Sequence, residues 1–346
     1  MTFSKILTDW YSVNKRQLPW RQTTNPYYIW LSEIILQQTQ IKQGLPYYQD
    51  FVSVFPTVFD LANANEAEIL KLWQGLGYYS RARNLHAAAK YVVEDLNGVF
   101  PTNYKDLLKL KGVGDYTASA IASICYNEVS AVVDGNVYRL LSRYFGIYTP
   151  INSSKGAKEF KVLAQELIDK KDPATFNQAV MEFGAIQCKP KSPDCTVCPF
   201  NSSCYAYGKD VISELPVKIK AAKVSKKYFN FLVFLTPSHT TILEQRQGKG
   251  IWQNLYQFPL IESEKALTSK QLQQELEQFE LLEGKTFEVS LYNKDEIVHK
   301  LSHQHLYTQF WIVEVDANLA GEIPVSEVED FPVPILIGNF IEDFNF

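Results

Sequence analysis

Over most of residues 1–205, apolar side chains recur every three to four positions, which is the spacing of amphipathic α-helices. Glycines and prolines separate the helical runs and indicate turns. Ser4 is expected to cap the first helix, and Pro26 suits the first turn of the second. The pattern therefore predicts a mainly α domain, with helices over residues 4–14, 26–39, 65–73, 83–96, 104–110, 116–126, 137–144, 154–168 and 173–183.

The pattern changes after about residue 209, where Pro216 stands among several lysines. Beyond this stretch, alternating apolar runs predict strands over 228–235, 240–245, 286–292 and 307–315, with a helix over 268–282. These elements indicate a second, α+β domain. We expect a helical domain over 1–215, a basic linker over 216–227 and the α+β domain over 228–346.

Composition and charge narrow the class of protein. A chain of 346 residues with 46% hydrophobic content is long enough for two cores. Residues 1–220 hold 24 Lys and Arg against 20 Asp and Glu, whereas the rest of the chain has a charge of −8 within the overall −4. The chain thus joins a mildly basic domain to an acidic one. The basic domain can still present a face that binds phosphate, despite the negative overall charge. The N-terminal residues lack a signal sequence and no apolar run is long enough to span a membrane, so we expect a cytoplasmic protein.

Four of the five cysteines gather in a short segment with the spacing Cys188-x6-Cys195-x2-Cys198-x5-Cys204. Structural zinc sites usually join two short-spaced pairs, and only one Cys-x-x-Cys pair occurs here. A disulfide framework is typical of small secreted chains. The spacing favours a [4Fe–4S] cluster, although it differs from the ferredoxin runs, and zinc remains the alternative.

Two carboxylates are candidates for catalysis. Glu33 is the one acid in an apolar helical stretch, and a carboxyl group desolvated there can keep its proton near neutral pH, as a general acid requires. Asp134 follows an apolar run and begins a helix, so it is expected to be an N-cap whose anion the helix terminus favours. Together they suggest the division of labour that breaks glycosidic bonds.

Three short segments suggest contact with nucleic acid. Gly112 and Gly114 join two predicted helices in a hairpin whose backbone N–H groups suit a phosphate. Gln37 ends the Glu33 helix, while Tyr78 and Arg81 follow a glycine turn. Exposed Gln and Tyr side chains can wedge into a base stack while Arg holds a phosphate.

These segments together resemble the helix-hairpin-helix DNA glycosylase superfamily with an iron–sulfur cluster, and most closely the adenine-DNA glycosylases of the MutY type. The matching stretches are residues 18–21, 30–40, 75–83, 112–118, 134–137 and the four cysteines, with the hairpin at about 104–126 and the cluster loop at 188–204. The resemblance implies a base-excision-repair enzyme that flips adenine out of an A:8-oxoguanine or A:G mispair and hydrolyses its glycosidic bond.

The resemblance also implies roles for individual residues. Glu33 corresponds to the acid that protonates adenine N7, and Asp134 to the carboxylate that stabilises or traps the oxocarbenium-like sugar. Tyr116 and Asn136 support that step, and Gln37 and Tyr78 probe the duplex beside the lesion. The residues implied to line the adenine pocket are Arg16, Trp20, Leu36, Gln178 and Met181. Those implied to bind the cluster are Cys188, Cys195, Cys198 and Cys204. Lys189 and Lys191, in the first loop between the cysteines, are expected to meet phosphates.

Position 116 separates two branches of the superfamily. Endonuclease III relatives carry a lysine there, whose amine forms a Schiff base and cuts the strand, and Tyr116 cannot do this. We therefore expect a monofunctional glycosylase. The alternatives are an endonuclease III-like glycosylase/lyase for oxidised pyrimidines and a non-catalytic iron–sulfur protein for DNA binding or redox sensing.

The C-terminal domain resembles the Nudix-like module of the same glycosylases, through residues 250–259. Residues 270–284 lack the acid-rich box that binds Mg²⁺ in Nudix hydrolases, so the module is expected to recognise 8-oxoguanine without hydrolysing nucleotides. Ser302 and His303 correspond to the residues that meet the oxidised guanine, although Leu301 replaces an aromatic residue. The resemblance implies double-stranded DNA as the partner, and we expect a monomer in the cytoplasm, associated with the nucleoid.

Overall fold

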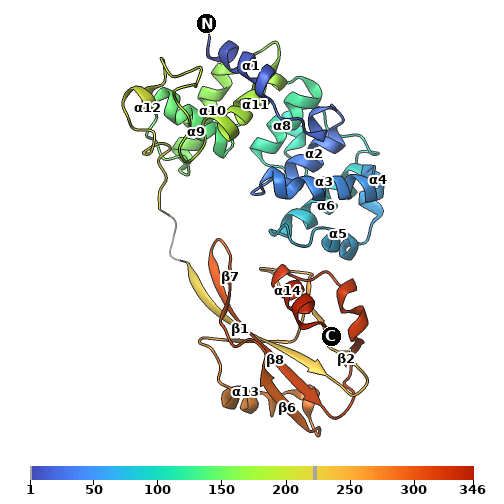
Figure 1. Cartoon of the computed structure of the whole chain (residues 1–346). Helices are drawn as coiled ribbons and strands as arrows, with labels where there is room; N and C mark the ends of the chain where they lie inside the picture. Colours follow the sequence, from blue (N-terminus) through green and yellow to red (C-terminus); the bar gives the residue numbers. More distant parts are fainter. Residues whose placement is uncertain (1, 221–223) are drawn as a thin grey trace. The chain divides into compact units, whose positions relative to one another are not determined.

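The computed structural model describes residues 2–220 and 224–346 (Figure 1). Its contacts divide the chain into two compact units, of which the first holds Met1–Asn63 and Asn84–Lys220 and the second Ala64–Arg83 and Ala221–Phe346. Residues 64–83, which the sequence pattern assigns to the helical domain, thus group with the C-terminal unit. Within the described residues, the helices lack the length and apolar character that a membrane span requires.

The first unit is built from helices, as the sequence pattern predicts. They are α1 (Phe3–Asn14), α2 (Pro26–Ile35), α3 (Ile41–Val54), α4 (Val58–Asn63), α7 (Tyr104–Leu107), α8 (Asp115–Tyr126), α9 (Gly135–Phe145), α10 (Ser154–Leu167), α11 (Pro173–Glu182) and α12 (Tyr205–Gly208), with most of α6 (Ser80–Glu94), a 3-10 turn η1 (Pro19–Arg21) and a π-helical turn η2 (Phe183–Gln187).

The clearest differences from the predicted elements lie at the start of α1, at the end of α2 and over residues 41–63. Thr2, not Ser4, caps α1, because its side chain accepts the Lys5 N–H at 3.3 Å. The second helix ends at Ile35 and not at residue 39, because Gln38 adopts a left-handed φ of 59°. Helices α3 and α4 were not predicted. Helix α3 contains Gly44 and Pro46, which both have a poor helical propensity.

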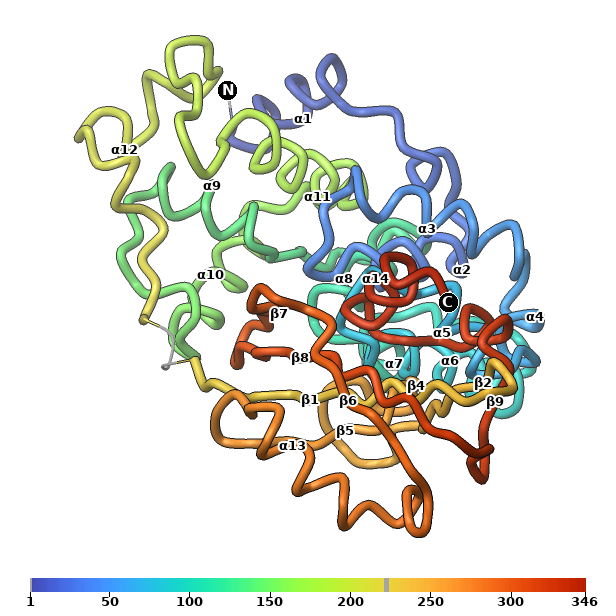
Figure 2. The backbone as a smooth tube through the Cα atoms, turned by 60° about the horizontal axis from the view of Figure 1, so that its bottom comes forward, coloured from blue at the N-terminus to red at the C-terminus, as the bar shows by residue number. Residues whose placement is uncertain are grey.

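One aromatic cluster joins the first helix of the chain to its cysteine loop. Helix α1 lies against α11, as both views show (Figures 1 and 2). The Phe3 ring stacks on that of Phe200 with centroids 5.0 Å apart, and Phe183 meets Phe200 edge-on at 5.2 Å. Since Phe200 lies between Cys198 and Cys204 in the sequence, the core of the unit fixes the position of the cysteine loop.

The second unit contains a mixed sheet with the strand order β5-β1-β8-β6, in which β7 also pairs with β8. The central strands β1 (Ser225–Leu235) and β8 (Gln304–Val315) are parallel, and Phe231 lies opposite Phe310. The remaining elements are α5 (Glu66–Leu72), β2 (Thr240–Thr241), β3 (Glu244–Gln245), β4 (Tyr256–Gln257), β5 (Leu260–Ser263), α13 (Ser269–Leu276), β6 (Phe287–Leu291), β7 (Ile297–Lys300), β9 (Ile323–Pro324) and α14 (Ile335–Phe344), with 3-10 turns η3 (Glu280–Leu282) and η4 (Val325–Asp330).

The mixed sheet confirms the predicted α+β class. The strand predicted over 240–245 is split into β2 and β3, and the helix predicted to residue 282 ends at Leu276 before a 3-10 turn. The C-terminal helix α14 was not predicted. Its Phe340 ring stacks on Phe310 of β8 at 4.1 Å, so α14 covers one face of the sheet.

Candidate active site

A cavity of about 1060 Å³ opens in the helical unit. Glu33 comes from α2, Tyr116 from α8, and Asp134 and Asn136 from the start of α9. The structure therefore brings together residues that lie more than 100 positions apart. Among the residues that the sequence analysis proposes, the cavity is lined by Arg16, Trp20, Glu33, Leu36, Gln37, Gly112, Gly114, Tyr116, Asp134, Asn136, Gln178 and Met181.

Glu33 is the candidate acid, and its side chain is held in an apolar helix. The residue is only 7% exposed, because nearly all of α2 is buried. Burial raises the pKa of Glu33 to about 7, a hydrogen bond with Tyr116 lowers it, and the neighbouring Asp134 raises it. The carboxyl group consequently holds its proton in the neutral pH range, where an ordinary glutamate has lost it.

Asp134 caps α9, as predicted. Its Oδ1 accepts the backbone N–H groups of Asn136 at 2.9 Å and Val137 at 2.8 Å, and its Oδ2 accepts the Asn136 side-chain amide at 2.7 Å. Burial raises the pKa of Asp134, while these hydrogen bonds and the charge of Arg139 favour the anion. The same contacts that begin the helix therefore fix the direction of the carboxylate.

Tyr116 is hydrogen-bonded to Glu33 in the cavity. Its hydroxyl also lies 3.1 Å from the Met181 sulfur. Burial, together with the nearby acids Glu33 and Asp134, holds the pKa of Tyr116 well above its usual value. The phenol therefore stays protonated, and it can orient the Glu33 carboxyl group by hydrogen bonding.

Arg139 connects this site to the cysteine loop. Its Nη2 donates to the Asn136 side-chain oxygen at 2.8 Å and to the Gly184 carbonyl at 2.6 Å, and its Nε donates to the Cys188 carbonyl at 2.7 Å. The sequence analysis did not single out this buried arginine. One planar guanidinium thereby fixes Asn136, and through it Asp134, relative to the loop.

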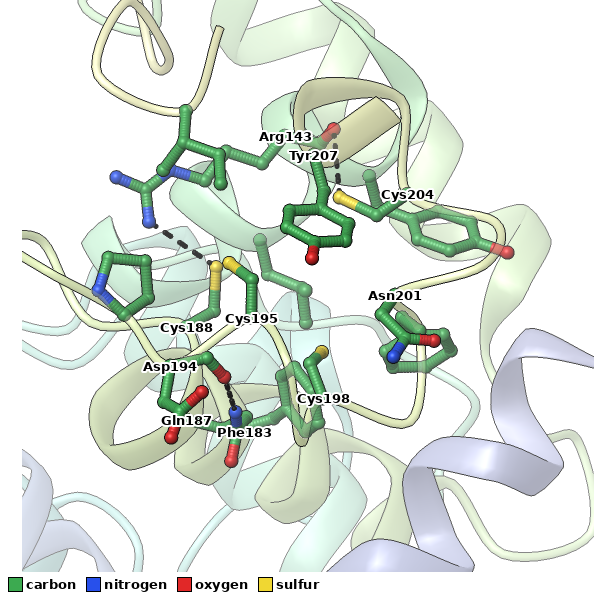
Figure 3. A pocket seen from close by; sticks show the side chains of 15 residues that line it. Arg143, Phe183, Gln187, Cys188, Asp194, Cys195, Cys198, Asn201, Cys204 and Tyr207 are labelled. Carbon is green, nitrogen blue, oxygen red and sulfur yellow. Dashed lines mark hydrogen bonds between the residues drawn. The ribbon is translucent and has the colours of Figure 1, made fainter. Parts of the chain in front are cut away.

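The four cysteines of the loop point toward a common space (Figure 3). All four are free thiols in this structure. Arg143, a second arginine that the sequence analysis missed, donates to the Cys188 sulfur at 3.5 Å and to the Lys189 carbonyl at 2.8 Å.

Zinc and a [4Fe–4S] cluster require different arrangements of the four thiols. In a zinc site all four sulfurs lie about 2.3 Å from one ion, whereas each cysteine of a [4Fe–4S] cluster binds its own iron. Within the part of the chain that the structure describes, no three His, Cys, Asp or Glu side chains converge closely enough to hold a single ion. Four free thiols in one pocket supply donors that suit either group, and Arg143 adds a positive charge beside them.

Left-handed backbone occurs at the predicted probe Tyr78 and at Gln38, the neighbour of the other predicted probe, Gln37. Gln38, beside Gln37, has φ of 59°, while Tyr78 has φ of 48° and is 53% exposed. Backbone of this kind is costly and occurs often at functional sites. Gln37 itself lies 3.3 Å from the Thr117 hydroxyl, on the hairpin that carries Gly112 and Gly114.

Arg81 differs from its expected role. The side chain is buried, donates to the carbonyls of Leu76 and Gly77, and lies over the Trp73 ring at 5.0 Å. Burial lowers its pKa to about 10. Its guanidinium therefore braces the turn that presents Tyr78 and does not face outward toward a phosphate.

Ser302 and His303 form the exposed tip between β7 and β8. The His303 carbonyl accepts the Ser225 N–H at 3.2 Å, and this bond ties the tip to the start of β1. The Ser302 hydroxyl lies 3.4 Å from His303 Nδ1. Both side chains are thus accessible on a hairpin that the sheet supports.

Comparison with known protein families assigns both units. Residues 31–168 match the HhH-GPD superfamily of base excision DNA repair proteins, and residues 230–343 match the NUDIX domain. The helical unit, with its hairpin and buried carboxyl groups, is thus that of a base excision DNA repair protein. The solved structure of a thermostable thymine-DNA glycosylase is similar to 60% of this chain and 95% of its own, with a TM-score of 0.56 and 32% identity. An endonuclease III–DNA complex shares the fold, with a TM-score of 0.53 and 21% identity, and the match covers 60% of this chain and 94% of that chain.

Full-length relatives identify the branch. The adenine DNA glycosylase of Buchnera aphidicola subsp. Baizongia pistaciae is 35% identical over 319 residues, which cover 90% of this chain and 86% of that protein. The adenine DNA glycosylase of Rattus norvegicus is 45% identical over 226 residues, covering 62% and 44%, respectively. The chain belongs to the adenine DNA glycosylase family.

Gly184 provides a test of the packing behind Asn136. A Cβ atom at Gly184 would lie 2.6 Å from the Asn136 carbonyl oxygen, which is backbone and cannot move aside cheaply. We expect Gly184→Ala to destabilise the protein by about 1–3 kcal/mol. Thermal or denaturant unfolding measures this loss.

The matched control is Gly208→Ala, because a Cβ atom at Gly208, the last residue of α12, meets nothing within 4 Å. It should leave the midpoint of unfolding unchanged or slightly higher. Equal stability of Gly184→Ala and the wild type would show that α9 and η2 are less closely packed than the structure has them.

Proposed function

We propose that this protein removes adenine from DNA in base excision repair, at adenines mispaired with 8-oxoguanine or guanine, and that it does so by hydrolysis without cutting the strand. The observation that carries the proposal is the meeting of Glu33, Tyr116 and Asp134 in one cavity. A protonated acid beside a hydrogen-bonded carboxylate is the arrangement that glycosidic bond cleavage needs. The family relationship to adenine DNA glycosylases supports adenine as the base.

In this mechanism Glu33 supplies the proton. The group carries it at neutral pH because burial raises its pKa to about 7, and the Tyr116 hydroxyl orients it. Transfer to N7 of adenine neutralises the charge that the departing base would otherwise take. The base must first leave the stack, and the cavity that holds Glu33 is large enough to receive it.

Asp134 acts on the sugar. The positive charge that develops at C1′ as the bond breaks is stabilised by the Asp134 carboxylate, which is held in place by Asn136 and Val137. Its oxygen either remains an ion partner or bonds to C1′ before water replaces it. Position 116 offers a phenol where a lyase needs an amine, so no Schiff base forms there.

The remaining cavity residues suit an adenine ring. Trp20, Leu36 and Met181 supply apolar surface, while Arg16 and Gln178 supply polar groups at its edge. The exposed Lys189 and Lys191 and the hairpin glycines Gly112 and Gly114 are proposed to hold phosphates, and Gln37 and Tyr78 to probe the duplex. Ser302 and His303 are proposed to meet the oxidised guanine.

We further propose that Cys188, Cys195, Cys198 and Cys204 hold a [4Fe–4S] cluster. When bound, it would fix the fold of residues 188–204 and with it the exposed Lys189 and Lys191. The chemistry at the base and the sugar belongs to Glu33 and Asp134.

A strand-cleavage assay tests the proposed reaction. Purified protein is incubated with a labelled duplex that contains one A opposite 8-oxoguanine, and samples are analysed with and without hot alkali. The wild type should give breaks at the adenine only after alkali. Glu33→Gln should lose about 10²-fold or more in rate, because it has no proton to give. Asp134→Asn should also be strongly impaired.

Glu166→Gln is the control, since this acid is exposed on α10 and should keep full activity. Breaks without alkali would instead favour a glycosylase/lyase, and tight binding without base release would favour a non-catalytic DNA-binding protein. Full turnover by Asp134→Asn would remove its assigned role.

Thymine is a second candidate base, favoured by the 32% identity to the thymine-DNA glycosylase structure. A duplex with T opposite G, assayed in parallel, decides between the two. Faster release of thymine than of adenine would replace the proposed substrate.

The pKa of Glu33 predicts the pH dependence. Burial raises it to about 7, so the protonated acid predominates below that pH and is lost as the pH rises through it. The single-turnover rate should be near its maximum at about pH 6 and fall about tenfold per pH unit above 7. A rate that stays constant between pH 6 and 9 would contradict general acid catalysis by Glu33.

A cysteine substitution tests the cluster. Cys198→Ser should lose bound iron and sulfide, unfold at a lower temperature and bind duplex DNA more weakly, because the loop loses its fixed shape. Cys125→Ser is the matched control, since Cys125 lies on α8, outside the loop. Retention of full iron content and DNA affinity by Cys198→Ser would count against the ligand assignment.

A further inference from the structure

A carboxylate that the proposed mechanism does not use lies in the wall of the same cavity. Glu182 ends α11, its side chain is 1% exposed, and it pairs with two arginines. Arg16 donates to it from Nε at 2.8 Å, from Nη2 at 2.6 Å and from its backbone N–H at 2.9 Å. Arg21 donates from Nη1 at 3.0 Å and from Nη2 at 2.8 Å. One buried carboxylate therefore carries two bidentate ion pairs.

The Arg21 guanidinium is fixed on every side. Its Nε donates to the Gln178 side-chain oxygen at 3.1 Å and its Nη1 also donates to the Arg16 carbonyl at 3.1 Å. The Cζ atom of Arg21 lies 5.6 Å from the centre of the Tyr11 ring. The side chain is 12% exposed, so Glu182 and Gln178 together hold Arg21 at one position in the wall.

Stability alone is a weak reason for this cluster. Buried ion pairs are often no better for folding than apolar side chains of the same volume, because desolvation offsets the attraction. Here all three charged groups line the cavity that also holds Glu33. Their position therefore points to a role in the reaction.

The net charge of Arg16, Arg21 and Glu182 affects the protonation of Glu33. Two arginines and one carboxylate leave a net charge of +1, and the Arg21 charge already favours the ionised form of Glu33. Glu182 itself is ionised, since the arginines hold its pKa at about 2. The titratable groups that face Glu33 are Tyr116 and Cys125 of α8, Asp134 of α9 and Arg21 of η1, while Arg16, Arg21 and Tyr11 of α1 face Glu182.

We propose that Glu182 is a positioning residue for the reaction: its carboxylate holds Arg16 and Arg21 in the cavity wall and offsets their charge, so that Glu33 keeps its proton. This inference rests on the proposed function, in which Glu33 is the acid. Loss of the Glu182 charge would leave Arg16 and Arg21 uncompensated in the cavity wall, and the Arg21 charge, which already acts on Glu33, would favour release of its proton more strongly.

Two measurements on the full chain test the inference. The first is the single-turnover rate of adenine release between pH 5.5 and 9. The second is the titration of the Glu33 carboxyl group by ¹³C NMR in protein with labelled glutamate, assigned with Glu33→Gln. In Glu182→Gln, the pKa of Glu33 should fall by about one unit. The decrease of the rate at high pH, which we call the basic limb of the profile, should therefore begin about one pH unit lower. The rate should then fall about tenfold at pH 8 but only about twofold at pH 6.

Three further variants separate charge from packing. Arg16→Gln/Glu182→Gln removes one charge of each sign, and the basic limb should return to its wild-type position even if the rate is low. Glu182→Asp keeps the charge, so the limb should stay in place while the rate falls. Glu262→Gln is the control, because Glu262 pairs with Lys227 and Arg246 in the other unit and should change neither measurement.

A rate loss in Glu182→Gln that is equal at every pH, with Glu33 titrating as in the wild type, would overturn the inference. If Glu182→Gln does not fold, a limb displaced in Glu182→Asp or in the double variant would overturn it, and an unmoved limb in both would support it. Absence of adenine release by the wild type would refute the proposed function, while the NMR titration would still decide the role of Glu182.

Discussion

Burial of the Glu33 carboxyl group is the constraint on which the helical unit depends. An acid that loses its water favours its neutral form, and this makes a proton available at neutral pH. The same burial makes the group sensitive to every nearby charge, since screening by water is weak there. Tyr116, Asp134 and Arg21 therefore have to be held at fixed positions, and the surrounding contacts are those that hold them.

Helix capping supplies much of this fixation. Asp134 begins α9 and in doing so uses two backbone N–H groups that any helix must satisfy. Arg139, one turn further on, carries the constraint to Gly184 and Cys188. The cysteine loop and the Asp134 carboxylate are thus two ends of one hydrogen-bonded frame, so a change in the loop can move the carboxylate.

The sequence predicts those features that depend on neighbours along the chain. The solitary acid of an apolar helix, the cap of α9 and the four cysteines are visible as local patterns. Glu182 has the same signal as Glu33, an acid within an apolar run, but its arginine partners lie more than 160 positions away. The orientation of Arg81 depends on the ring of Trp73, and the grouping of residues 64–83 with the C-terminal unit depends on tertiary contacts. Helix α3 was missed because tertiary packing overrides the poor helical propensity of Gly44 and Pro46.

The packing of α1 against α11 and Phe200 has a consequence for how the protein folds. Phe3 and Leu7 of α1 find their partners in segments that lie more than 100 positions further along the chain. Contacts of such long sequence separation form slowly, because the intervening loop must close first. The segment that closes this core is also the one that carries the four cysteines. Completion of this core and ordering of the cysteine loop therefore depend on the same long-range contacts.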